Sequence, residues 1–142
     1  MSRARWALIG LAAAALLAVP ASRGIRSLMM TRRAVATYVA LLAAADAQDL
    51  DAVRALCTAR YLRAHPPAPA PGGGVKGLPR GIHPDFRAWR DGEAALLCPT
   101  GRASRRPAYR FVFEGGGCRF DGPAGLLLPD GRVEGVPSDG FF

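Results

Sequence analysis

Apolar residues recur three and four positions apart over residues 31–45, which is the spacing of one face of an α-helix. The stripe consists of Val35, Tyr38, Val39, Leu42 and Ala45. Thr31 stands at its start and is a candidate N-cap, because a threonine hydroxyl can accept a hydrogen bond from a free backbone N–H. The polar stretch 46–49 interrupts the stripe, so we expect the first helix to end there.

A second helix is predicted to begin after Asp49, whose carboxylate can cap it and suits the positive end of the helix dipole. Its expected inward positions are Leu50, Val53, Leu56, Cys57 and Tyr61. The helix must stop at His65, because Pro66 and Pro67 follow and disfavour helical backbone in the preceding residue. Two helices joined by a short turn form a helical hairpin.

Residues 66–81 show no apolar period and contain Pro-Ala-Pro followed by Gly-Gly-Gly. This composition predicts a Pro/Gly loop or linker, semi-rigid in its first half and flexible in its second.

The pattern then changes to that of β-strands. A short apolar run over residues 93–98 follows an Asp-Gly turn pair. Tyr109, Phe111 and Phe113 then alternate with Arg110, Val112 and Glu114, a period of two that buries an aromatic face.

Three glycines at 115–117 predict a turn, after which Cys118 and Phe120 return on the inner face of a second strand. Residues 126–128 and 132–136 flank a Pro-Asp-Gly turn and predict a C-terminal hairpin. Helices first and antiparallel strands afterwards favour the α+β class.

The N-terminus carries a targeting or anchoring signal. Arg3 and Arg5 precede the apolar run Trp6–Val19, and small residues follow at 19–21, where a signal peptidase would cut. A spanning helix needs about 20 apolar residues, so the run suits a cleaved signal peptide or a short retained anchor. We therefore assign residues 1–21 to a signal peptide or membrane anchor, and expect an exported or membrane-anchored protein of the cell envelope.

A basic juxtamembrane segment, residues 22–30, comes next, and arginines continue to Arg33. The arginines that follow the apolar run are Arg23, Arg26, Arg32 and Arg33. They outnumber the two before it, so a retained run would leave the following domain on the cytoplasmic side by the positive-inside rule. The same arginines can instead form the solvated start of a helix or rest on anionic headgroups.

Composition changes this picture little. The 142 residues suffice for one domain, 50% of them are hydrophobic, and the formal net charge is +8. The basic clusters lie in flanks and loops, away from the aromatic residues, which argues against a nucleic-acid-binding face.

The order of elements carries a resemblance. Residues 38–57 read Y-V-x-L-L-x-A-A-D-x-x-D-L-D-A-V-R-A-L-C, and residues 109–122 read Y-R-F-V-F-E-G-G-G-C-R-F-D-G. This combination resembles the small exported members of the nuclear transport factor 2-like superfamily. The resemblance implies a cone-shaped α+β roll with a pocket, or a reduced helix-plus-sheet roll, which we place over residues 31–128. Residues 129–142 are expected to form the C-terminal hairpin and tail.

On this resemblance we expect a non-catalytic domain that binds a small hydrophobic ligand or another envelope protein. The concave aromatic face of Tyr109, Phe111 and Phe113 is the candidate ligand-binding surface. The alternative for these aromatics is a plain core beneath the helical hairpin.

An enzymatic alternative rests on His83 and Asp85. Enzymes on the resembled roll use Asp, His or Tyr inside the cone, so this pair is the candidate acid and base of a lyase or isomerase. Two residues apart across Pro84, the pair also fits a turn in which Asp85 caps a short helix through Trp89.

Cys57, Cys98 and Cys118 match no metal-binding spacing, and no phosphate-binding glycine loop is present, so we expect neither metal nor cofactor. An oxidising compartment would allow a Cys98–Cys118 disulfide across neighbouring strands. Three buried thiols are the alternative.

Overall fold

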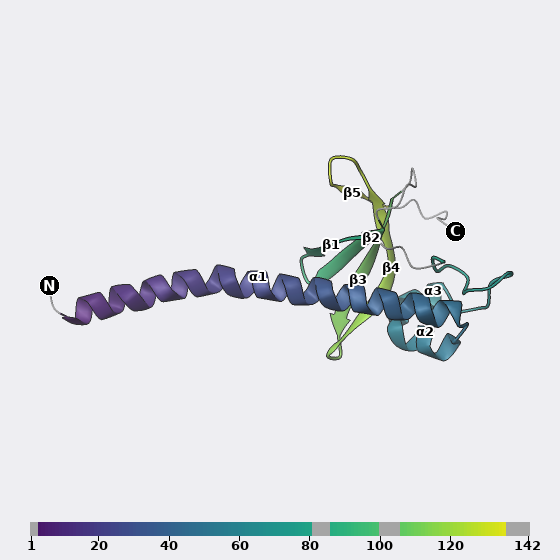
Figure 1. Ribbon diagram of the computed structural model, residues 1–142, viewed down its shortest axis with the longest axis horizontal. Helices are drawn as coiled ribbons and strands as arrows, with labels where there is room; N and C mark the ends of the chain where they lie inside the picture. Colours follow the sequence, from purple (N-terminus) through teal and green to yellow (C-terminus); the bar gives the residue numbers. More distant parts are fainter. Residues whose placement is uncertain (1–2, 81–85, 100–105, 136–142) are drawn as a thin grey trace.

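A computed structural model describes residues 3–80, 86–99 and 106–135, with side chains from Ser22 onward. The chain is α+β, with an N-terminal helix and a curled antiparallel sheet (Figure 1). The helices are α1 (Arg3–Asp46), α2 (Leu50–Leu56) and α3 (Ala59–Ala64). The strands are β1 (Phe86–Asp91), β2 (Ala94–Pro99), β3 (Pro107–Glu114), β4 (Gly117–Leu127) and β5 (Val133–Glu134), and they lie in this order in the sheet.

Helix α1 is a single unbroken element that begins at Arg3, contains the N-terminal apolar run and continues into the domain (Figure 1). The expected helix start at Thr31 is therefore wrong. The Thr31 hydroxyl donates back to the carbonyls of Ser27 and Leu28 at 3.1 and 3.0 Å, as a threonine inside a helix does. The residues between the apolar run and the domain helix include Pro20 and Gly24, which disfavour a helix interior, yet the backbone is helical across both, so the two stretches form one helix.

The domain half of α1 packs on the sheet through one stripe. Its buried residues include Ala34, Tyr38, Leu41, Leu42 and Ala45. Tyr38 stacks on Tyr109 with ring centroids 6.0 Å apart and meets Phe111 edge-on at 6.3 Å. The predicted stripe is confirmed at Tyr38, Leu42 and Ala45, but Val39 is 37% exposed and Leu41 is buried instead.

The second predicted helix is two short helices with a break at Cys57 and Thr58. Asp49 caps α2 as expected, accepting a bond from the Ala52 N–H at 3.1 Å. At the break Cys57 forms a parallel bridge with Phe120 of β4, and the Thr58 N–H donates to the Phe120 carbonyl at 2.9 Å. A continuous helix would use those groups internally, so pairing with the sheet accounts for the interruption. The predicted end at His65 is confirmed.

The strand predictions for β2, β3 and β4 are confirmed, and the turn between β3 and β4 has positive φ at Gly115 and Gly116. The C-terminal hairpin forms through β4 and β5, with Leu127 opposite Val133. Strand β1 was not predicted: Phe86–Asp91 pairs with β2 along its whole length, so the expected short helix through Trp89 is wrong.

The Pro/Gly loop docks on the domain over the part described, residues 66–80. Its backbone closes on itself, with the Lys76 N–H donating to the Ala68 carbonyl at 2.9 Å, and Val75 and Leu78 are buried. The Tyr61 hydroxyl donates to the Gly77 carbonyl at 3.2 Å. The flexible second half expected from composition is thus held by apolar contacts.

Gly122 provides a test of this packing. Its φ is +97°, and a Cβ added there would lie 3.0 Å from the Tyr61 ring. We expect Gly122→Ala to lower the free energy of unfolding by about 1–3 kcal/mol, because backbone strain adds to the close contact. Urea denaturation followed by circular dichroism measures the change.

Gly131→Ala is the matched control, because Gly131 also has positive φ, +85°, but an added Cβ meets nothing within 4 Å. It should cost only backbone strain, about 1–2 kcal/mol. Equal losses in the two variants would show that the contact between residue 122 and Tyr61 is unimportant.

Candidate functional site

The sequence-predicted aromatic face is mostly interior. Tyr109 and Phe111 are buried under α1 and belong to the hydrophobic core, as the alternative of a plain core expects, and their contact with a ligand stays a prediction. Phe113, one alternation further along β3, is only partly buried. Because α1 crosses the sheet here, the aromatic strand is core for most of its length and reaches an open surface only at Phe113.

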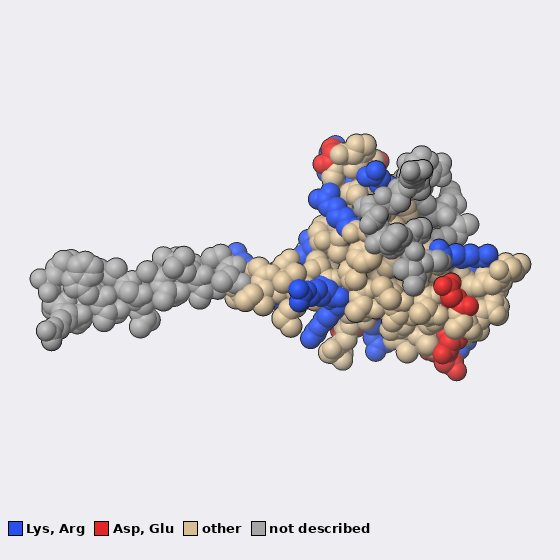
Figure 2. Space-filling view, viewed as in Figure 1, with Lys and Arg blue, Asp and Glu red and all other residues tan. Residues whose placement is uncertain are grey.

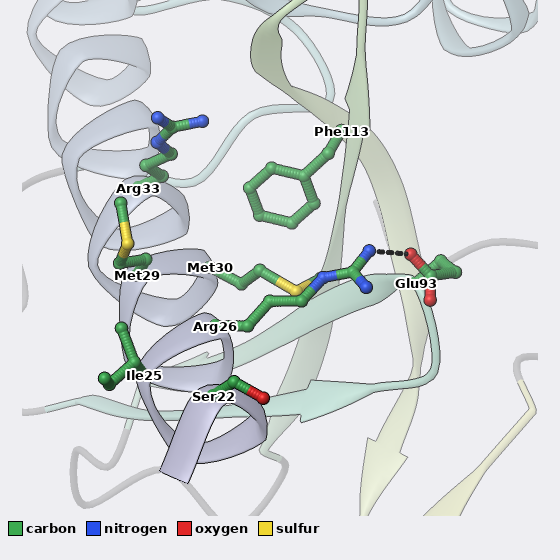
Figure 3. A pocket seen from close by; sticks show the side chains of 8 residues that line it. All are labelled: Ser22, Ile25, Arg26, Met29, Met30, Arg33, Glu93 and Phe113. Atoms are coloured by element: carbon green, nitrogen blue, oxygen red, sulfur yellow. Dashed lines mark hydrogen bonds and ion pairs between the residues drawn. The ribbon is translucent and has the colours of Figure 1, made fainter. Parts of the chain in front are cut away.

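That open surface is a groove of about 510 Å³ between α1 and the sheet (Figure 3). Its lining residues are Ser22, Ile25, Arg26, Met29, Met30, Arg33, Glu93 and Phe113. The six residues from α1 are three, four and seven apart, so they share one helix face. Glu93 comes from the turn before β2 and Phe113 from the end of β3. The volume falls within the range of small-molecule sites, about 300–1,000 Å³.

The groove combines an apolar floor with a charged rim. Met29, Met30 and Phe113 supply flexible thioethers and an aromatic ring, which adapt well to apolar ligands. At the rim, Arg26 Nη2 lies 2.7 Å from Glu93 Oε2, the pair drawn with a dashed line in Figure 3. Arg90 also approaches Glu93, at 3.5 Å. The groove can therefore hold an apolar chain with a polar end at the arginines.

Asp121 is the buried carboxylate of the described core and a second place to look for chemistry. It is 7% exposed and accepts hydrogen bonds from the Thr58 hydroxyl at 2.7 Å and from Arg60 Nη2 at 2.7 Å. Arg110 lies 3.9 Å away. Burial raises the pKa of Asp121, but the hydrogen bonds and the arginine charges outweigh it and leave the pKa below its ordinary value. An ionised, fully bonded carboxylate ties α3 to β4 and is poorly suited to proton transfer.

The three cysteines are free thiols, and the premise of the predicted disulfide is wrong. Cys98 lies on β2 and Cys118 on β4, with β3 between them. Leu97, next to Cys98, pairs with Tyr109, whereas Cys118 pairs with Phe113 four residues further along β3. Continuing this register places Cys98 opposite position 108, five residues from Phe113. Two strand spacings and about 16 Å along the strands exceed the reach of a disulfide, roughly 7 Å between Cα atoms.

Burial raises the pKa of all three thiols, to about 12 for Cys57. They are protonated near neutral pH and lack the thiolate that nucleophilic or metal chemistry requires. Within the described ranges no group of three or more His, Cys, Asp and Glu side chains is placed to hold a metal ion. His83 and Asp85 lie outside the described residues, so the acid–base pair stays a prediction.

The groove was not predicted from the sequence, because residues 22–30, which supply most of its helix face, were placed in a juxtamembrane segment outside the domain. The signal was nevertheless present: residues 22, 25, 26, 29, 30 and 33 follow helical spacing. Comparison with known proteins adds nothing to this site, since no family model, curated protein or solved structure matches the chain.

The buried carboxylate makes stability depend on pH. Because the pKa of Asp121 is lower in the folded state than its unfolded value of about 3.9, its stabilisation is present above that value. It is lost as the pH falls through the folded-state pKa. We expect Asp121→Asn to lower the free energy of unfolding at pH 7 by about 1–3 kcal/mol and to flatten its decline below pH 4, measured by urea denaturation across pH.

Asp51→Asn is the control, because Asp51 forms an exposed ion pair with Arg54 and such pairs contribute little. If the free energy of unfolding of Asp121→Asn declined below pH 4 as steeply as that of the wild type, Asp121 would not be the source of this pH dependence.

The thiols can be counted directly. Under denaturing, non-reducing conditions we expect three reactive thiols per chain, because no cysteine pair is in bonding range. In the folded protein, Cys57 and Cys98 should react at least roughly a hundredfold more slowly, since burial and a raised pKa both suppress the thiolate. Ellman's reagent measures both, and one reactive thiol in denaturant would instead indicate a disulfide.

Proposed function

We propose that the chain is a membrane-anchored, non-catalytic binding domain of the cell envelope. The apolar run 6–19 remains in the bilayer as an anchor, and the α+β domain binds a hydrophobic ligand or protein segment in the groove. The curled sheet covered by helices agrees with a reduced nuclear transport factor 2-like roll, which we propose as the fold family.

The continuity of α1 is the observation that carries this proposal. The helix that contains the apolar run also supplies Tyr38, Leu41 and Leu42 to the domain core (Figure 1). A cleaved signal peptide is normally separated from its domain by an extended segment, whereas residues 19–21 are helical here. A short anchor is accommodated by local bilayer thinning and by flanking arginines that reach the headgroups.

A second stretch of the same helix has the length and composition of a membrane span, Ser22–Asp46, with mean hydropathy 1.3. One third of its most apolar window is buried in the domain. Tyr38, Leu41 and Leu42 of this stretch are packed against the sheet, which favours the upstream run as the anchor.

A charge placed in the anchor tests the proposal. We expect the full chain to stay with membranes after alkaline carbonate extraction and to keep the mass of the uncut chain, 15.0 kDa. Leu11→Arg should release most of it, because an arginine at the centre of a spanning helix costs about 2.5–3.5 kcal/mol. Immunoblotting of pellet and supernatant, with intact mass, measures both.

The matched control is Ala40→Arg, at an exposed position on the same helix within the domain. It should leave the distribution unchanged. A soluble wild-type product that begins near Ser22 would contradict the anchor and indicate a cleaved signal.

A further inference from the structure

Arginine side chains line and flank the groove. Four arginines occur in three helical turns beside it: Arg23, Arg26, Arg32 and Arg33. All four are exposed, and Figure 2 shows arginine or lysine side chains gathered where α1 leaves the body of the domain. No acidic residue precedes Asp46 in the sequence, so Glu93 is the carboxylate that faces this surface.

The same surface exposes large apolar side chains. Ile25 and Met29, which line the groove, are 60% and 51% exposed. A soluble domain gains nothing from such side chains next to four cations, whereas an anionic amphiphile matches both. Its charged end pairs with the arginines and its hydrocarbon contacts Ile25, Met29 and Phe113.

The position of the groove on α1 identifies the source of that amphiphile. At a rise of about 1.5 Å per residue, Ser22 is about 4.5 Å and Arg26 about 10 Å beyond the last residue of the apolar run. The headgroup layer on each side of a bilayer is about 5–7 Å thick. An anchored helix therefore places the Ser22 end of the groove at the headgroups of its own membrane, with Arg26 just beyond them and Arg33 about 21 Å from the end of the run, so a lipid bound at both arginines is partly drawn out of the bilayer.

The Arg26–Glu93 pair does not block an anionic ligand. The two side chains are 59% and 75% exposed, and such surface pairs contribute at most about 1 kcal/mol. A phosphate that binds Arg26 competes with the Glu93 carboxylate and replaces it. Glu93 thereby weakens anion binding at the rim.

We propose that the groove binds an anionic phospholipid of the bilayer in which the chain is anchored, with its phosphate at Arg26 and Arg33 and an acyl chain along Met29 and Phe113. This inference rests on the proposed function, because it requires the anchor. It adds the chemical class of the ligand.

The experiment uses the full chain in nanodiscs of phosphatidylcholine with one fifth phosphatidylglycerol. After release into mild detergent, native mass spectrometry measures which lipid stays bound to the protein. We expect one retained phosphatidylglycerol per chain, enriched over its share of the bilayer and reduced by added salt. Arg26→Gln with Arg33→Gln should lower the ratio of bound phosphatidylglycerol to bound phosphatidylcholine about 30-fold, since each arginine near an anionic surface contributes about 1 kcal/mol.

Two further variants separate binding from damage to the fold. Glu93→Gln should increase the enrichment several-fold, a gain that unfolding cannot produce. Arg54→Gln with Arg63→Gln removes the same charge from α2 and α3, whose positions are outside the groove lining, and should change nothing.

The outcomes distinguish the two proposals. A chain that does not stay in the nanodisc overturns the anchor itself. An anchored chain with bound lipid at the bulk composition, or with enrichment unaffected by the Arg26 and Arg33 substitutions, overturns the lipid site alone. A protein dimer in place of a lipid adduct, lost in the Arg26 and Arg33 variant, would assign the groove to a second copy and also overturn it.

Discussion

The packing of α1 against the curled sheet is the contact on which the rest of the molecule depends. Tyr38 lies against Tyr109 and Phe111, and Leu41 and Leu42 extend the contact along the helix. Burial of large aromatic and aliphatic side chains contributes the most to a domain of this size. It also aligns the N-terminal half of α1 relative to the sheet, so the groove exists only because this contact holds.

A second connection joins the short helices to the same sheet. Cys57 and Thr58 pair with the backbone of Phe120. The carboxylate of the next residue, Asp121, accepts hydrogen bonds from the side chains of Thr58 and Arg60. These contacts explain why the helix is interrupted between α2 and α3. The Arg60–Asp121 pair joins an exposed arginine to a buried carboxylate, and it specifies which strand the helices meet.

Local periodicity predicted much of this fold. The alternation at Tyr109, Phe111 and Phe113 predicted β3, and the helical stripe predicted burial of Tyr38 and Leu42. Both signals arise from neighbours along the chain. Strand β1 was missed because Phe86–Asp91 carries Arg87 and Arg90 and has only intermediate or exposed positions, so its pairing with β2 is visible only in three dimensions.

The candidate site was harder to predict than the fold. The alternation marked Phe113 as equivalent to Tyr109 and Phe111, and nothing local to β3 shows that α1 covers two of the three. Likewise, the predicted disulfide between Cys98 and Cys118 required their strands to be adjacent. Strand order depends on the whole sheet, so local sequence could not show that β3 lies between them. The face of α1 that lines the groove had a clear helical spacing, but it was hidden by its closeness to the apolar run.

The unbroken backbone of α1 also couples the angular position of the domain to the apolar run at its N-terminal end. An α-helix turns about 100° and advances about 1.5 Å with each residue. Inserting or deleting one residue between the apolar run and Tyr38 would therefore swing the domain about a third of a turn around the helix axis while hardly altering its height. The number of residues in this stretch therefore sets the direction in which the domain faces as well as its distance from the apolar run.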